Sequence, residues 1–110
     1  MRLLQQLETP SKIVRAKQIA LDNLDEIVSF LLPYVTTTPR YWLLSDIHTP
    51  CAGRAGSMWI YRTGDKRGGW VDAGNHATAR KSGDVLHLIK EKLGHNNINE
   101  TADWVIFYYA

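Results

Sequence analysis

Cationic and aromatic side chains are concentrated in one short part of the sequence, from Met58 to Asp72. They lie in two strand-like segments, MWIY and WVD, and in the polar turn between them. The residues concerned are Trp59, Tyr61, Arg62, Lys66, Arg67 and Trp70. Lysine and arginine bind phosphate groups, and aromatic rings stack on nucleic-acid bases. This combination favours a nucleic-acid-binding surface.

The alternation of side chains along a strand separates the aromatic residues from the core. Met58 and Ile60 share one face of the first segment, and Trp59 and Tyr61 share the other. We expect Met58 and Ile60 to face the core, which leaves Trp59 and Tyr61 as candidates for base stacking. Trp70 follows two glycines and is expected to be a large core anchor.

Further cations lie on either side of this segment. Arg80 and Lys81 precede a predicted helix that starts near Asp84, and the N-terminus of a helix attracts phosphate. Asp84 itself is expected to cap this helix. The full set of expected nucleic-acid-binding residues is Arg54, Trp59, Tyr61, Arg62, Lys66, Arg67, Arg80 and Lys81.

The net charge is distributed unevenly along the chain. The whole sequence carries +2, whereas residues 36–83 contain seven lysines or arginines and three aspartates, a net charge of +4. Cations of this kind can bind phosphates, but they can also serve only to keep a surface soluble. The charge alone leaves both interpretations open.

Four potential metal ligands form a separate candidate site. They are arranged as His48-x-x-Cys51 and Asp72-x-x-x-His76. All four are possible zinc ligands, and the first pair has the spacing found in zinc fingers. Structural zinc sites seldom contain a carboxylate, and histidines are common in loops. We therefore expect no bound metal or other cofactor, with these four residues as the alternative.

The hydrophobic spacing predicts a single α+β domain over residues 1–110. Residues 1–34 are expected to be helical, as two helices or one kinked helix, and residues 83–109 to form two more. Residues 40–73 contain three strand candidates, RYWLLS, SMWIYR and GGWVDA, which predict a small three-stranded antiparallel sheet packed against a helix. Residues 35–39 are expected to be an extended linker, and residues 75–82 a polar loop.

The composition excludes several classes of protein. A chain of 110 residues with 45% hydrophobic and 22% charged residues is typical of a folded globular domain, not of a disordered one. No apolar run approaches the length of a membrane span. The single cysteine excludes an internal disulfide and suits a reducing compartment, so a cytoplasmic location without membrane contact is expected.

Several short motifs occur in an order that resembles a known family. They are Leu31-Leu32-Pro33, Tyr41-Trp42, Gly68-Gly69-Trp70-Val71-Asp72, the segment from Gly83 to Ile89, and the segment from Asn97 to Val105 with Glu100 and Trp104. This order resembles the N-terminal zinc-ribbon domain of bacterial, plasmid and phage DNA primases, most closely a variant found before Toprim domains. The resemblance implies a zinc-ribbon-like sheet that binds single-stranded template DNA beside a Toprim or other replication protein.

The chain departs from this family at the metal site. The family's zinc cysteines are absent, so zinc binding is not carried over, and Trp42, Trp59 and Trp70 are expected to supply the core in place of the metal. Using Trp59 in the core conflicts with its use in base stacking, and the sequence does not decide between the two.

Two functions follow from these observations. The first is a module that binds single-stranded DNA in plasmid or phage replication or in conjugation. The second is a protein-docking module that keeps a degenerate primase fold and binds its partner through the apolar segment from Trp104 to Tyr109. The acidic catalytic motifs of Toprim domains have no counterpart here, so the chain is not expected to be an enzyme on its own.

Overall fold

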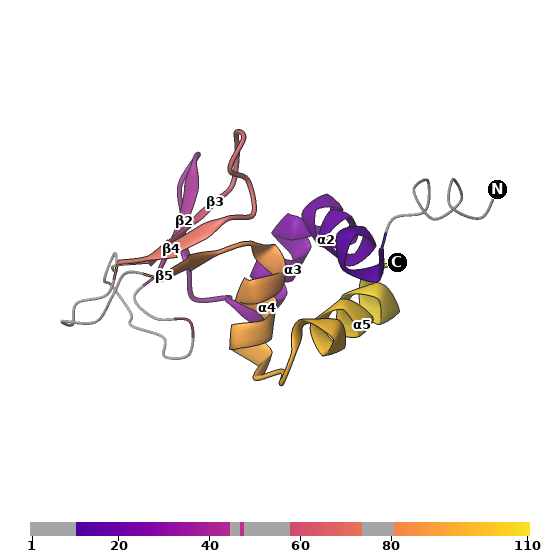
Figure 1. Cartoon of the computed structure of the whole chain (residues 1–110). Helices are drawn as coiled ribbons and strands as arrows, with labels where there is room; N and C mark the ends of the chain where they lie inside the picture. Colours follow the sequence, from indigo (N-terminus) through magenta and orange to yellow (C-terminus); the bar gives the residue numbers. More distant parts are fainter. Residues whose placement is uncertain (1–10, 45–46, 48–57, 74–80) are drawn as a thin grey trace.

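The computed structural model of the chain describes residues 11–44, 47, 58–73 and 81–110. Within these residues the fold is α+β, as predicted, with four helices and a five-stranded antiparallel sheet (Figure 1). The elements in chain order are α2 (Lys12–Asp22), α3 (Leu24–Leu31), β1 (Thr36–Thr37), β2 (Tyr41–Leu44), β3 (Met58–Tyr61), β4 (Trp70–Asp72), β5 (Lys81–Gly83), α4 (Val85–Leu93) and α5 (Ile98–Tyr109).

The sheet is a meander in which each strand pairs with the next one along the chain, in the order β1-β2-β3-β4-β5. Strands β2, β3 and β4 are the three predicted from the sequence. Strands β1 and β5 correct that prediction, since they lie where an extended linker and the end of a polar loop were expected. Both are too short to show a period of two in the sequence. They form because their backbones pair with β2 and β4, at Thr37↔Trp42 and Val71↔Ser82.

One face of the sheet is buried against the helices. Burial alternates along β2 and β3 with a period of two. The buried side chains of this face are Trp42, Leu44, Met58, Ile60 and Trp70. The prediction that Met58 and Ile60 face the core is confirmed, as is the core position of Trp70. Trp59 is half-buried on the opposite face, so only Trp42 and Trp70 contribute to the core as expected.

The helices pack on one side of the sheet, and α5 lies farthest from it (Figure 1). Helix α5 packs against α2 and α4. The helical part of the core consists mainly of aliphatic side chains, namely Ala16, Ala20, Leu24, Ile27, Val28, Val85, Leu86, Leu88, Ile89, Ala102 and Val105. Their burial provides the hydrophobic stabilisation that the short strands need. None of the helices in the described residues is long and apolar enough to cross a membrane.

From residue 11 onwards, where the structure describes the N-terminal region, it forms two separate helices and not one kinked helix. Ser11 caps α2, and its side chain accepts a hydrogen bond from the backbone N–H of Val14. Asn23 ends α2 but makes no capping hydrogen bond to α3, because its side-chain amide donates to the carbonyl of Ile19 at 2.8 Å. The side chain of Asn23 therefore does not cap α3.

Both C-terminal helices begin at a capping side chain, and the cap predicted at Asp84 is confirmed. Asp84 caps α4, and Gly94 ends it in the left-handed conformation, with φ of 71°. Asn97 caps α5 and accepts a hydrogen bond from the backbone N–H of Glu100 at 2.9 Å. Trp70 Nε1 donates to the carbonyl of Asp84 at 2.9 Å, and this bond joins β4 to the start of α4.

Candidate nucleic-acid interface

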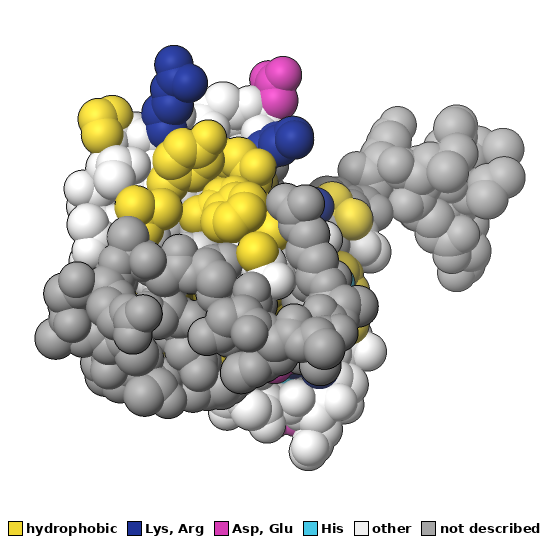
Figure 2. Space-filling model, turned by 90° about the vertical axis from the view of Figure 1, so that its left-hand side faces the viewer, with side chains coloured by type: hydrophobic (Ala, Val, Ile, Leu, Met, Phe, Trp, Pro, Cys, Tyr) yellow, Lys and Arg dark blue, Asp and Glu magenta, His cyan; other side chains and the backbone are white. Residues whose placement is uncertain are grey.

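The face of the sheet that points away from the helices carries aromatic and aliphatic side chains. These half-buried residues are Tyr41, Leu43, Trp59, Tyr61 and Val71. The strand register sets Tyr41 beside Tyr61, and Leu43, Trp59 and Val71 in one row across β2, β3 and β4. Figure 2, which views the molecule from the side of the sheet, shows hydrophobic side chains gathered in one patch with lysine or arginine side chains at its rim. We refer to Tyr41, Leu43, Trp59, Tyr61 and Val71 as the outer sheet face.

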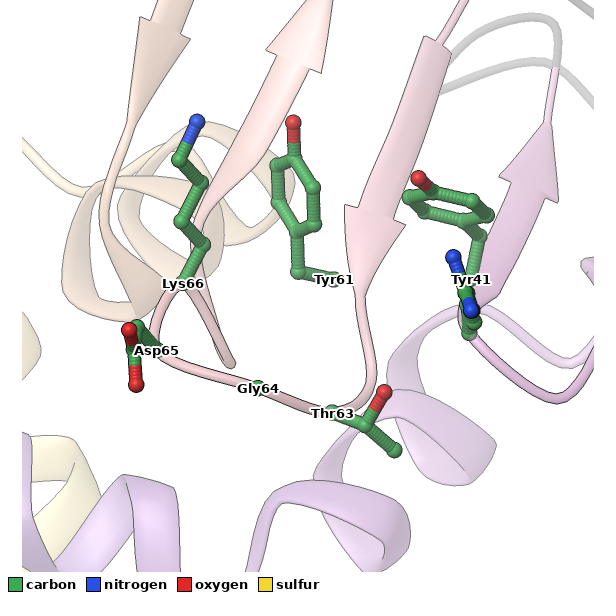
Figure 3. A pocket seen from close by; sticks show the side chains of 7 residues that line it. Tyr41, Tyr61, Thr63, Gly64, Asp65 and Lys66 are labelled. Atoms are coloured by element: carbon green, nitrogen blue, oxygen red, sulfur yellow. The ribbon is translucent and has the colours of Figure 1, made fainter.

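A hollow lies at the end of the outer sheet face beside the β3–β4 loop (Figure 3). Its volume is about 460 Å³. It is lined by Arg40, Tyr41, Tyr61, Thr63, Gly64, Asp65 and Lys66. The centroids of the two tyrosine rings are 5.4 Å apart at an interplanar angle of 58°. Lys66 Nζ lies 5.6 Å from the centroid of the Tyr61 ring, so Tyr61 stands between a cation and a second aromatic ring.

The three cations of the β3–β4 loop point to different places. Lys66 is exposed beside the hollow. Arg62 donates a hydrogen bond to the carbonyl of Thr38, and its guanidinium lies 5.1 Å from the centroid of the Trp42 ring. Arg67 donates to the carbonyl of Leu21 at 2.7 Å. The structure therefore assembles Lys66 with the tyrosines, whereas Arg62 and Arg67 join the loop to the residue after β1 and to the end of α2.

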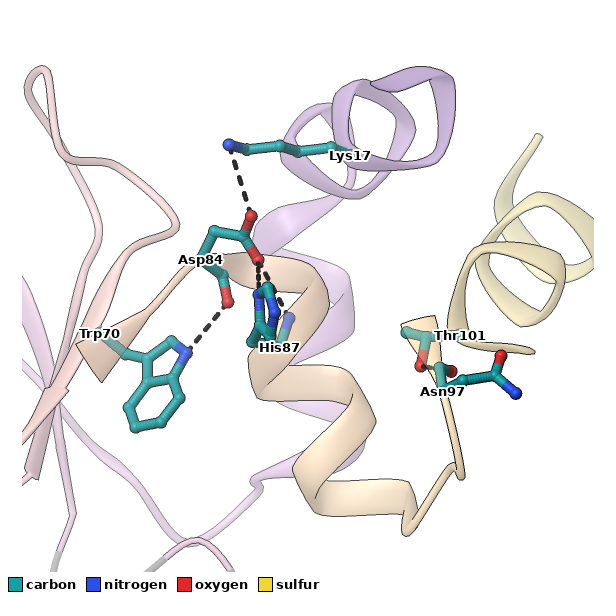
Figure 4. A network of polar contacts seen from close by, with 6 residues as sticks. All are labelled: Lys17, Trp70, Asp84, His87, Asn97 and Thr101. Atoms are coloured by element: carbon teal, nitrogen blue, oxygen red, sulfur yellow. Dashed lines mark hydrogen bonds and ion pairs between the residues drawn. The ribbon is translucent and has the colours of Figure 1, made fainter. Parts of the chain in front are cut away.

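A second polar cluster lies at the start of α4, around Asp84 (Figure 4). The Oδ1 atom of Asp84 accepts a hydrogen bond from the backbone N–H of His87 at 3.0 Å and lies 2.8 Å from His87 Nδ1. Lys17 Nζ lies 3.5 Å from Oδ2. Burial raises the pKa of the Asp84 carboxyl, but the hydrogen bonds from His87 and the charges of His87 and Lys17 outweigh burial and hold the pKa below its ordinary value.

The Asp84 carboxylate lies at the N-terminus of α4, where the sequence predicted a phosphate site beside Arg80 and Lys81. The first turn of α4 already donates to a negatively charged side chain, and a phosphate beside it would be repelled. We therefore leave the N-terminus of α4 out of the proposed interface.

Several predicted site residues lie outside the described part of the chain. They are Arg54 and Arg80 of the nucleic-acid set, and His48, Cys51 and His76 of the metal alternative. For Lys81 the structure describes only the backbone, in β5. Asp72, the fourth potential metal ligand, ends β4. Within the described ranges, no group of three or more His, Cys, Asp or Glu side chains could hold a metal ion.

Comparisons with protein-family models, with curated proteins and with solved structures found no match to this chain. The resemblance to primase zinc-ribbon domains therefore depends only on the motifs in the chain's own sequence.

Arg40 and Tyr41, which supply a cation and a ring to the hollow, were not predicted as site residues. The segment RYWLLS was expected to be a strand, but its pairing register with β3 was not available from the sequence. The loop between β2 and β3 is long, and a long loop does not fix the register as a tight turn does. The only feature of the sequence that could have indicated these two residues is an arginine next to a tyrosine at the start of a predicted strand.

Proposed function

We propose that this chain is a binding module for single-stranded DNA and that the outer sheet face is its binding surface. The observation that carries the proposal is the hollow at the end of this face, where Tyr41 and Tyr61 lie side by side and Arg40 and Lys66 are also part of the lining. Aromatic rings and cations in one shallow site match the two repeating parts of a nucleic-acid strand, its bases and its phosphates.

The aromatic side chains favour a single strand over a duplex. Bases in a duplex are stacked on one another and cannot stack on protein rings, whereas bases of a single strand can. Tyr61 and Trp59 lie on the same face of β3, and Tyr41 adds a ring from β2. A strand that follows this face would stack one base on Tyr61 and a neighbouring base on Tyr41 or Trp59.

The cations supply affinity that does not depend on base sequence. Arg40 and Lys66 are exposed at the hollow, and among the described residues that line it Asp65 is the one acidic residue. Phosphates bound by these two cations release counterions, so binding weakens as the salt concentration rises.

The resemblance to primase template-binding domains indicates a role for such a module. In this role the chain presents single-stranded template to a Toprim or primase catalytic domain in plasmid or phage replication or in conjugation. The chain itself carries out no catalysis and needs no metal in this proposal, and synthesis belongs to the partner.

Fluorescence anisotropy of a labelled single strand of about 15 nucleotides tests the proposal. The wild-type chain should bind at about 50 mM salt and more weakly at about 200 mM salt. Reversal of both cations, Arg40→Glu with Lys66→Glu, should abolish binding at the higher salt concentration. The charge-reversal control is Arg15→Glu with Lys12→Glu, on exposed positions of α2, which should retain most of the affinity. Absence of wild-type binding at low salt would refute the proposal.

A specific observation also favours protein docking as a second function. Large apolar side chains are exposed on the helical side of the molecule, with Phe30 66%, Phe107 77% and Tyr108 62% exposed. Exposed apolar side chains that cluster in this way mark interaction surfaces. Because this surface belongs to the helices, it does not compete with the outer sheet face.

A further inference from the structure

A second hollow lies among α3, α4 and α5, on the helical side of the molecule. Its volume is about 610 Å³. It is lined by Glu26, Phe30, Leu93, Trp104, Tyr108 and Tyr109. Four of these six side chains are aromatic and one is a carboxylate. We refer to this hollow as the aromatic pocket.

The rings of the aromatic pocket form a connected wall. The centroid of the Trp104 ring lies 5.2 Å from that of Tyr108 and 5.7 Å from that of Tyr109. The interplanar angles are 49° and 54°, so the rings enclose a space instead of stacking flat on one another. Phe30 and Tyr108 are both largely exposed, which leaves the wall accessible from solvent.

Glu26 gives this apolar site a charge. Glu26 stands in the first turn of α3, and no cation of the described residues forms an ion pair with it. Glu26 and Tyr109 line the same pocket, and the pKa of the Tyr109 hydroxyl is raised first by burial and further by the negative charge of Glu26. A negative charge beside several ring faces attracts a cation, because the ring faces are negative as well.

We propose that the aromatic pocket binds an arginine side chain from a partner protein, with the guanidinium between the rings and Glu26. A guanidinium is planar, stacks on aromatic faces and pairs with a carboxylate through two parallel hydrogen bonds. The pocket is larger than one side chain, and its exposed apolar wall fits a segment in which apolar residues flank the arginine. The inference assigns a partner chemistry to the docking surface and is independent of single-stranded DNA binding.

Titration with a short peptide tests this inference. The probe is acetyl-Gly-Leu-Arg-Leu-Gly-amide, and its control is the same peptide with citrulline, a neutral analogue of arginine. The readout is the indole N–H resonance of Trp104 in the ¹⁵N-labelled chain, assigned from the spectrum of Trp104→Phe. The arginine peptide should shift this resonance to saturation, and the citrulline peptide should bind about tenfold more weakly.

A matched pair of variants on α3 distinguishes direct binding by the Glu26 carboxylate from long-range attraction by any negative charge on this helix. Glu26→Gln should weaken arginine-peptide binding by about tenfold. Asp25→Asn removes the same charge from the neighbouring, exposed position and should leave the affinity within about twofold. Both variants should stay folded, because both side chains are exposed.

Four outcomes would overturn the inference. Equal affinity for the two peptides would show an apolar docking surface without a cation site. Equal effects of Glu26→Gln and Asp25→Asn would show only long-range attraction. Broadening of the Trp104 resonance with protein concentration alone would show that a second copy of the chain covers the pocket. No shift of Trp104 at any peptide concentration would exclude the site.

Discussion

At the scale of single residues, three cations of one loop have the same charge and different surroundings. Lys66 is exposed beside the Tyr61 ring, whereas Arg62 and Arg67 are half-buried and donate to backbone carbonyls. The sequence predicted a basic loop beside aromatic residues, and this much could be read from charge and spacing. It could not show which guanidinium would meet a carbonyl, because those carbonyls belong to Thr38 and Leu21, 24 and 46 residues away.

Substitution by glutamine at these two adjacent positions should therefore change different properties: DNA binding at Lys66 and stability at Arg67. Lys66→Gln should leave stability unchanged and lower the slope of log affinity for single-stranded DNA against log salt by about 1. Arg67→Gln should lower the free energy of unfolding by about 1–2 kcal/mol, because the Leu21 carbonyl loses a charged donor. Urea denaturation and anisotropy on both variants provide the measurement. A loss of stability in Lys66→Gln with none in Arg67→Gln would reverse our assignment of the two side chains.

At the scale of elements, the β3–β4 loop is docked on the end of α2. Gly68 has φ of +88°, and a Cβ atom there would lie 2.4 Å from Leu21 Cδ2. Gly64 in the same loop has φ of +82° but open space around it. The cap of α4, the buried face of β3 and the core role of Trp70 could all be predicted, because each depends on local spacing or capping chemistry. The docking of the β3–β4 loop on α2 could not be predicted, because it brings together segments that are far apart in the chain.

The two loop glycines form a matched pair for measuring this docking. Gly64→Ala should cost about 1 kcal/mol in free energy of unfolding, because an L-residue is strained at positive φ. Gly68→Ala should introduce the same backbone strain and lower the free energy of unfolding by about 1 kcal/mol more than Gly64→Ala does, because Leu21 must move away from the added methyl group. Chemical denaturation of both variants measures the difference. Equal costs would show that the loop is not packed on α2.

The cap of α4 should make stability depend on pH. The pKa of Asp84 is lowered from 3.8 in the folded chain, so the unfolded chain takes up the proton more readily. The carboxylate therefore stabilises the fold at neutral pH, and this stabilisation is lost as the pH falls from about 5 through the folded pKa. Asp84→Asn should keep the cap but remove this part of the acid dependence, whereas Asp84→Ala should also lose about 1 kcal/mol of capping energy at neutral pH.

The measurement is the thermal melting of the wild type, Asp84→Asn and Asp84→Ala between neutral and acidic pH. An acid dependence in Asp84→Asn as steep as in the wild type would show that other carboxylates account for it.

At the scale of the whole molecule, helices cover one face of a five-stranded sheet, and the outer sheet face lies on the opposite side. The α+β class and the three central strands could be predicted from hydrophobic spacing. The two edge strands could not, because Thr36–Thr37 and Lys81–Gly83 form only by pairing with a neighbour. The half of the site on β3 and its loop was predicted from residue types, and the half on β2 depended on a register that only the folded sheet reveals.

This chain has no counterpart of the zinc cysteines of the family that it resembles, and the core of its sheet contains tryptophans. Trp42 and Trp70 are 4% and 7% exposed, and they fill the sheet's inner face. We therefore expect the melting temperature to be unchanged after dialysis against EDTA. Elemental analysis of protein purified without a His tag or chelator should find no stoichiometric zinc. About one zinc per chain, with a large loss of stability in EDTA, would favour the His48, Cys51, Asp72 and His76 alternative.

The most direct test of the central claim is the affinity of Tyr61 variants for single-stranded DNA. Tyr61 is half-buried on the outer sheet face, so its side chain can be shortened without opening the core. At constant salt, Tyr61→Ala should weaken binding of a labelled single strand about tenfold, and Tyr61→Phe should bind as the wild type does, because stacking needs the ring and not the hydroxyl. Equal affinities of Tyr61→Ala and wild type, with both chains folded, would contradict base stacking on this face.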